Sequence, residues 1–91
     1  MAKKKIEKET LLTAIVENYT DEEILKADGL DEAVIGIEEN SMRLIYSMKE
    51  CIRIFMEEGM SEEEALDHFY YNVQGSYVGE KTPIWCNDTM G

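Results

Sequence analysis

The chain has few of the side chains from which catalytic and metal centres are built. Its 91 residues include one histidine and two cysteines. Cys51 and Cys86 lack CxxC spacing and no group of histidines accompanies them, so a zinc site is unsupported. No serine stands in a G-x-S-x-G elbow, and the phosphate-loop pattern G-x-x-x-x-G-K-S/T is absent. The sequence therefore predicts no catalytic residues, no metal, no cofactor and no enzymatic activity.

Long apolar runs are also missing. No segment approaches the ~18–20 apolar residues that a membrane helix requires. The N-terminus MAKKKIEKET is basic but has no apolar stretch behind it, so it does not resemble a secretory signal. We therefore expect a cytoplasmic protein that does not contact membranes. A disulfide between the two cysteines stays open, although the cytosol would keep both thiols reduced.

Basic residues are scarce and unevenly placed. Against 20 acidic side chains there are 9 basic ones, four of which are Lys3, Lys4, Lys5 and Lys8. Residues 9–91 carry 19 acidic and 5 basic side chains, a net charge of −14. Such a body repels phosphate backbones, which argues against direct nucleic-acid binding, and suits a protein partner with a basic surface. The alternative is that the acidic side chains only maintain solubility.

The apolar pattern predicts one α+β domain over residues 6–91, behind a flexible basic arm at 1–5. The expected order is α-α-β-β-α-α-β, with an antiparallel sheet packed against a helical hairpin. Capping-box spacing at Thr20/Glu23, Ser47/Glu50 and Ser61/Glu64 marks three helix starts. The expected elements are helices at 6–19, 21–27, 48–58 and 62–74, and strands at 32–38, 43–47 and 82–86.

Three further expectations concern particular residues in these elements. In the first strand, alternation places Ala33, Ile35 and Ile37 on one face. In the third helix, Cys51 belongs to the buried side, and Gly59 stands where a left-handed residue ends the helix.

His68 is expected to be structural. Asp67 points about 100° away from it on a helix, whereas Glu64, one turn earlier, can face it. We therefore expect a boundary histidine paired with Glu64. The glutamates at 62–64 are explained by the helix dipole. Asp28 and its acidic neighbours lack the order of a calcium-binding loop, so calcium there is a weaker alternative.

The segment NVQGSYVGEKTP is richer in glycine, tyrosine and polar residues than a connector requires. Glycines at this spacing bring backbone amides close to a ligand, or simply turn the chain. The two interpretations are equally favoured. In the structural one, Asn72 caps its helix and Tyr77 packs under the loop beside Glu80. In the functional one, the candidate binding residues are Asn72, Gly75, Tyr77, Gly79, Glu80, Thr82 and Pro83.

Three strings together resemble a family of small bacteriophage and prophage proteins that have no assigned function. They are DEAVIG at 31–36, GMSEEEA at 59–65 and FYYNVQGSYVGEKTP at 69–83. The resemblance covers roughly residues 31–85 and leaves out the N-terminal helix and the lysine arm. It supplies no catalytic residues. It implies a phage-like origin and an accessory role in host takeover, replication or counter-defence.

These observations lead to a first hypothesis of an acidic accessory protein that binds and modulates a host or phage protein. It would act as a nucleic-acid mimic or a counter-defence inhibitor. The alternative is a protein that binds a small ligand or nucleotide with the loop at 72–83, as an oligomer if one chain is too short to form a pocket. A third hypothesis, a virion component with coiled contacts at its N-terminal helix, ranks last because that helix is short.

Overall fold

The computed structural model describes residues 10–75 and 79–90. The helical elements are α1 (Leu11–Asn18), the 3₁₀ turn η2 (Asp31–Ala33), α2 (Met48–Glu57), α3 (Glu62–His68) and the π-helical turn η3 (Phe69–Gln74). The strands are β1 (Val34–Glu38), β2 (Arg43–Ser47) and β3 (Ile84–Cys86). The α+β class and the order α-α-β-β-α-α-β are confirmed, with η2 as the second helical element. Within the described ranges, no helix has both the length and the apolar character needed to cross a bilayer.

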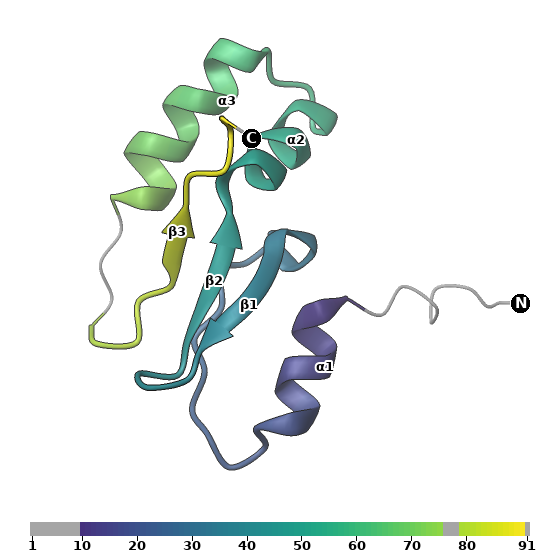
Figure 1. Cartoon of the computed structure of the whole chain (residues 1–91). Coiled ribbons are helices and arrows are strands. Elements are labelled where there is room, and N and C mark those ends of the chain that lie inside the picture. Colours follow the sequence, from purple (N-terminus) through teal and green to yellow (C-terminus); the bar gives the residue numbers. More distant parts are fainter. Residues whose placement is uncertain (1–9, 76–78, 91) are drawn as a thin grey trace, which may run out of the picture.

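The sheet has the spatial order β1-β2-β3. The β1 and β2 strands form the expected antiparallel hairpin, and β3 lies parallel to β2. The sheet is therefore mixed, although mostly antiparallel. A parallel neighbour needs a long crossover connection, and α2, α3 and η3 together provide it. Figure 1 shows α1 beside β1 at one edge of the sheet, and α2 and α3 at the end of the sheet to which β2 points.

A bulge in β1 changes which of its residues face the core. Val34 pairs with Tyr46, but the next pair is Gly36 with Ile45, so Ile35 is an extra residue on this strand. Ala33 and Val34 are both buried, whereas Ile35 is 46% exposed. The prediction that Ala33, Ile35 and Ile37 lie on one face is therefore wrong. A strict alternation cannot anticipate an inserted residue.

The helix predicted at 21–27 is absent, and an irregular segment takes its place. The α1 helix ends at Asn18, and the chain turns where the Glu22 N–H donates to the Tyr19 carbonyl oxygen. The Ala27 N–H donates to Tyr46 Oη at 2.8 Å, which replaces a helical hydrogen bond with a tertiary one. An isolated helix of this length is marginal in water, so a long-range contact decides the conformation.

The turn between α2 and α3 follows the predicted chemistry. Gly59 has φ +112°, a value that side-chain-bearing residues rarely adopt. Its N–H donates to the Met56 carbonyl oxygen at 3.1 Å, and the Met60 N–H donates to the Phe55 carbonyl oxygen at 3.2 Å. This pair of hydrogen bonds is a Schellman motif. Ser61 then begins α3 with the expected reciprocal capping box.

The C-terminal residues return to the start of α2 (Figure 1). The Asp88 carboxylate accepts hydrogen bonds from Ser47 Oγ at 2.6 Å and from the Lys49 N–H at 2.9 Å. Ser47 Oγ itself accepts from the Glu50 N–H, as its predicted capping role requires. The end of the chain thus supplies a second cap to α2.

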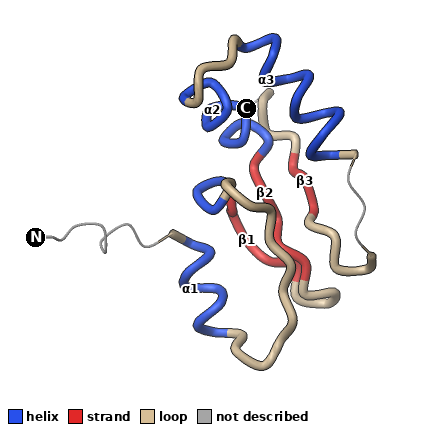
Figure 2. Tube along the Cα trace, turned by 180° about the vertical axis from the view of Figure 1, so that it is seen from behind, coloured by secondary structure: helices blue, strands red, loops and turns tan. Residues whose placement is uncertain are grey.

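The core brings together side chains of α1, β1, β2, α2 and α3, and Figure 2 shows these elements from behind. Tyr46 of β2 stacks on Trp85 of β3, with ring centroids 4.9 Å apart, and Phe69 meets Trp85 edge to face at 5.8 Å. Cys51 is fully buried, as predicted, and both cysteines are free thiols. This aromatic group holds β3 against the helical turn η3.

Candidate functional site: a cleft beside Trp85

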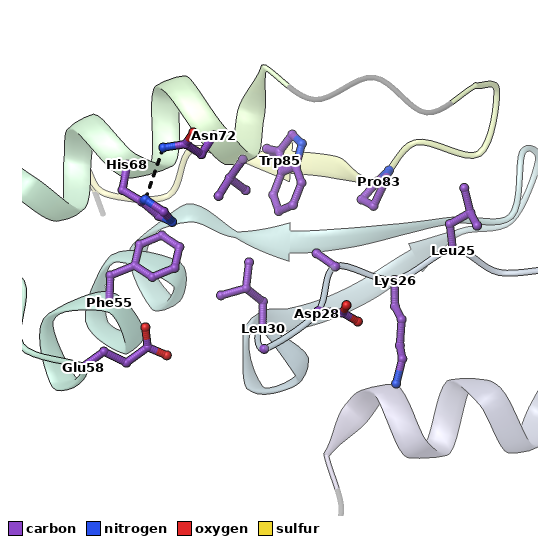
Figure 3. Close-up of a pocket in the computed structure, with 13 residues that line it drawn as sticks. Leu25, Lys26, Asp28, Leu30, Phe55, Glu58, His68, Asn72, Pro83 and Trp85 are labelled. Carbon is purple, nitrogen blue, oxygen red and sulfur yellow. Dashed lines mark hydrogen bonds between the residues drawn. The ribbon is translucent and has the colours of Figure 1, made fainter.

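A cleft of about 640 Å³ opens between the irregular segment at 25–30 and the helical hairpin (Figure 3). This volume is within the range of ~300–1,000 Å³ that small-ligand sites occupy. The lining residues come from four parts of the chain: Leu25, Lys26, Ala27, Asp28, Gly29, Leu30, Phe55, Glu58, His68, Asn72, Val73, Pro83 and Trp85.

The floor of the cleft is apolar. Leu30 and Phe55 are buried, and Trp85, which is half-buried, continues the surface on the β3 side. Val73 and Pro83 extend the same surface. Aromatic and aliphatic side chains of this kind supply most of the binding free energy in protein sites, because they release water when a partner covers them.

The first wall, residues 25–30, is held to the sheet by Tyr46. Besides the hydrogen bond from the Ala27 N–H to Tyr46 Oη, the Leu30 N–H donates to the Ala27 carbonyl oxygen at 3.3 Å. Gly29 has φ +81°, which lets the chain turn sharply at the rim. Burial raises the pKa of Tyr46, so its hydroxyl is uncharged at neutral pH. The wall is thus fixed by a contact from β2 rather than by regular structure of its own.

The second wall is the junction of α3 and η3. His68 packs edge to face on Phe55, with ring centroids 4.7 Å apart, and its Nδ1 is 3.2 Å from Asn72 Nδ2. The predicted pairing of His68 with Glu64 is wrong, because the Glu64 carboxylate accepts instead from the Ser61 N–H. Turns of π-helix are rare and occur frequently at functional sites. Here the turn follows the histidine and carries Asn72 and Val73, which both line the cleft.

Two of the predicted site residues, Asn72 and Pro83, line this cleft, and they enter it from opposite ends of the segment NVQGSYVGEKTP. Figure 3 shows Asn72 above His68 and Pro83 beyond Trp85. The functional interpretation of this segment therefore has a geometric basis at its two ends.

The other predicted site residues have different positions. Thr82 is buried, its Oγ donates to the Gly79 carbonyl oxygen at 2.6 Å, and its own carbonyl oxygen accepts from Arg43 Nε at 2.6 Å. Gly79 has φ +109°, so this tight turn requires glycine. Gly75 ends η3, and Glu80 is exposed. Thr82 and both glycines thus stabilise the conformation of the loop. Tyr77 lies outside the described residues.

The rim of the cleft is acidic. Asp28 and Glu58, both exposed, stand at its edge together with Lys26. Beyond Gly29 lies a second, shallower hollow of about 320 Å³, lined by Gly29, Asp31, Glu32, Ile54 and Glu57. Because Gly29 lines both hollows, they adjoin at this residue, and we refer to the pair as the Gly29 groove. Five carboxylates and one lysine line this groove.

Sequence reasoning missed most of this site. The sequence predicts a helix at 21–27, whereas residues 25–30 form an irregular wall. It places Phe55 in the helix expected at 48–58 and does not indicate that this residue lies beside a cleft. Trp85, the one tryptophan of the chain, was the available signal, because a tryptophan beside an exposed rim often marks a contact surface.

In the described parts of the chain, no group of three or more histidine, cysteine, aspartate or glutamate side chains is arranged to hold a metal ion. The chain matches no protein-family model, no curated protein and no solved structure. The site must therefore be interpreted from its own geometry.

Proposed function

We propose that the protein is a non-enzymatic binding protein that engages a basic surface of a partner protein. The observation that carries this proposal is the placement of its acidic side chains. The described residues include 18 carboxylates and 5 lysines or arginines. Fourteen of these carboxylates are exposed and none is buried. Their charges sum to a long-range negative potential that accelerates encounter with a positively charged partner.

Local pairing leaves most of this charge uncompensated. Arg53 is shared among three carboxylates, with contacts of 2.6 Å to Glu50, 2.6 Å to Glu57 and 3.4 Å to Glu32. Arg43 donates to a backbone carbonyl oxygen. The acidic surface therefore resembles a nucleic acid in the sign of its charge, which supports the nucleic-acid-mimic version of the proposal. The resemblance to phage and prophage proteins supports a host or phage protein as the partner.

The test is affinity capture of partners from bacterial lysate, at low and moderate salt and with competing DNA. We expect a stoichiometric partner that elutes as salt rises and is displaced by DNA. A variant with Glu22, Glu23, Glu62 and Glu63 changed to glutamine should capture less of it. The matched control changes the same four exposed residues to aspartate, which keeps the charge. Capture that is insensitive to salt and equal for both variants would refute charge-driven binding.

A second candidate function has support from the cleft itself. Its volume of about 640 Å³ and the presence of Asn72 and Pro83 in its lining favour a small-ligand site at the ends of the loop at 72–83. A thermal-shift screen with nucleotides and other metabolites tests this candidate. A ligand at 100 times its dissociation constant should stabilise the fold by ~2.7 kcal/mol. Asn72→Ala should lower that shift without lowering the unliganded melting temperature by more than a few degrees.

A further inference from the structure

We propose that the Gly29 groove binds a short segment of the partner protein in which lysine or arginine stands two positions after an apolar residue. The apolar side chain enters the cleft beside Trp85, and the cation enters the acidic hollow between Asp31 and Glu57. This inference rests on the proposed function and identifies the surface at which the protein binds its partner.

The cleft provides the apolar half of the site. Leu30, Phe55 and Trp85 form a floor on which one aliphatic or aromatic side chain can lose its water. The ring of His68 stands edge-on to Phe55, and its Nδ1 is within hydrogen-bonding distance of the Asn72 side chain. The polar atoms of that wall can form hydrogen bonds with the peptide backbone next to the apolar side chain that enters the cleft.

The second hollow provides the cationic half. Asp31 and Glu57 line it, and Asp28 and Glu58 stand at the adjoining edge of the cleft. Arg53 pairs with both Glu57 and Glu32 of this hollow, so three carboxylates stand against one arginine and the local charge stays negative. Charge complementarity therefore selects a basic residue for this end of the groove.

The connection between the hollows favours a peptide over a compact small ligand. Gly29 lines both hollows, and because glycine has no side chain, no Cβ separates them at this point. A Cβ at this position would meet no heavy atom within 4 Å, so the space on that side of Gly29 is open. An extended peptide places every second side chain on the same side, ~6–7 Å apart, which allows two of them to enter neighbouring hollows.

Trp85 is the only tryptophan of the chain and lies in the cleft, so its fluorescence reports occupancy directly. The probe is an acetylated pentapeptide, Gly-Leu-Lys-Arg-Gly, which contains no tryptophan. Two matched peptides replace either the leucine by serine or both basic residues by glutamine. We expect the first peptide to shift Trp85 emission with saturation. Each matched peptide should bind at least about fivefold more weakly.

Protein variants separate the two halves of the groove. Leu25→Ser removes an apolar side chain that lies at the cleft but outside the core cluster, and should weaken the leucine peptide about fivefold with an unchanged salt slope. The double variant Asp28→Asn, Glu58→Gln should weaken it about two- to fivefold and flatten the salt slope. Glu62→Gln, an exposed carboxylate on α3, is the matched charge control and should bind like the wild type.

Two results would overturn the inference. The first is equal affinity for the leucine and serine peptides. It would show that binding depends on charge alone and that the cleft does not bind the apolar side chain. The second is a Trp85 response to a small apolar probe without an indole ring, such as cyclohexanol, but not to any peptide, which would assign the cleft to a small ligand. Either result leaves the lysate experiment intact. If capture there fails as well, the proposed function fails with it.

Discussion

Tyr46→Phe is the change that most directly tests how the fold builds the cleft. The substitution removes one oxygen from a fully buried ring and keeps the aromatic packing on Trp85. The lost oxygen is the acceptor for the Ala27 N–H at 2.8 Å. This hydrogen bond is the contact that joins the irregular cleft wall at 25–30 to β2. We therefore expect the wall to loosen while the rest of the fold persists.

The expected cost follows from the position of the donor. A typical intramolecular hydrogen bond contributes ~0.5–1.5 kcal/mol, and a buried donor left without a partner costs ~1–3 kcal/mol. Ala27 is half-buried, so water can reach its amide once the wall moves. We expect a loss of about 1 kcal/mol in the free energy of unfolding. For a domain of this size that corresponds to ~4–8 °C in melting temperature.

Urea unfolding measures the global effect, and hydrogen exchange at the Ala27 amide measures the local one. That amide should exchange faster in Tyr46→Phe, and the leucine peptide should bind more weakly. Tyr71→Phe is the matched control, because Tyr71 is 81% exposed and the chemical change is identical. If the two variants have equal stability and Ala27 exchanges as in the wild type, the contact does not hold the wall and this explanation of the cleft is wrong.

The same variant predicts a change in alkaline stability. Burial raises the pKa of Tyr46 above its unfolded value of ~10. A group whose pKa is higher in the folded state than in the unfolded state contributes its full stabilisation at pH values below the unfolded pKa. That contribution is lost as the pH rises through the pKa of the folded state. Tyr46→Phe removes this component, so its stability deficit should shrink above about pH 10. The measurement is chemical unfolding of both proteins across that pH range.

Three further predictions concern other parts of the fold. Although partial burial opposes ionisation, hydrogen bonds from Ser47 and the Lys49 N–H lower the pKa of Asp88. Asp88→Asn should therefore cost about 1 kcal/mol at neutral pH, and the difference should disappear in acid as the wild-type carboxyl is protonated, below its unfolded pKa of ~3.9. Gly59→Ala should cost ~1–2 kcal/mol in urea unfolding, because its φ of +112° strains any side-chain-bearing residue while no atom lies in the way of the added Cβ. Burial raises the pKa of Cys51 to about 12, so a thiol reagent should label the half-buried Cys86 first, and equal rates would contradict the described core.

Local chemistry made much of the fold predictable. The serine caps at 47 and 61 and the glycine at 59 each act on the backbone within a few residues of themselves, so their effects can be deduced from spacing alone. Apolar periodicity located α1, α2 and the hairpin for the same reason. The bulge at Ile35 and the parallel placement of β3 depend on contacts between segments far apart in the chain. Periodicity contains no information on those contacts.

The candidate site was harder to predict because long-range contacts build it. Its first wall depends on the hydrogen bond from Ala27 to Tyr46, nineteen positions further along the chain, and on the packing of Leu30 in the core. The second wall is a π-helical turn at 69–74, where the apolar pattern indicates an ordinary α-helix. Asn72 and Pro83 were found because glycine and proline mark the ends of their loop. Phe55 and Trp85 could be recognised as apolar, but not as parts of a common cleft.

The small share of carboxylates that take part in contacts within the fold also supports a binding role. A few of them have a structural task that spacing explains. Glu38 accepts hydrogen bonds from the Ser41 side chain and from the backbone N–H groups of Asn40 and Ser41, which lower its pKa. Glu64 completes the cap of α3, and Asp88 caps α2.

Most of the exposed carboxylates have no comparable role in holding the fold together, and a large excess of one charge disfavours a compact chain through self-repulsion. Folding alone therefore gives no reason to retain them. A partner with the opposite charge would give one, since its approach turns the repulsion among these side chains into attraction across an interface. On this argument, neutralising Glu22 and Glu23, which are exposed and lie outside any helix, should leave the fold as stable as before or slightly more stable while binding declines. Equal losses of stability and binding would assign these residues to the fold instead.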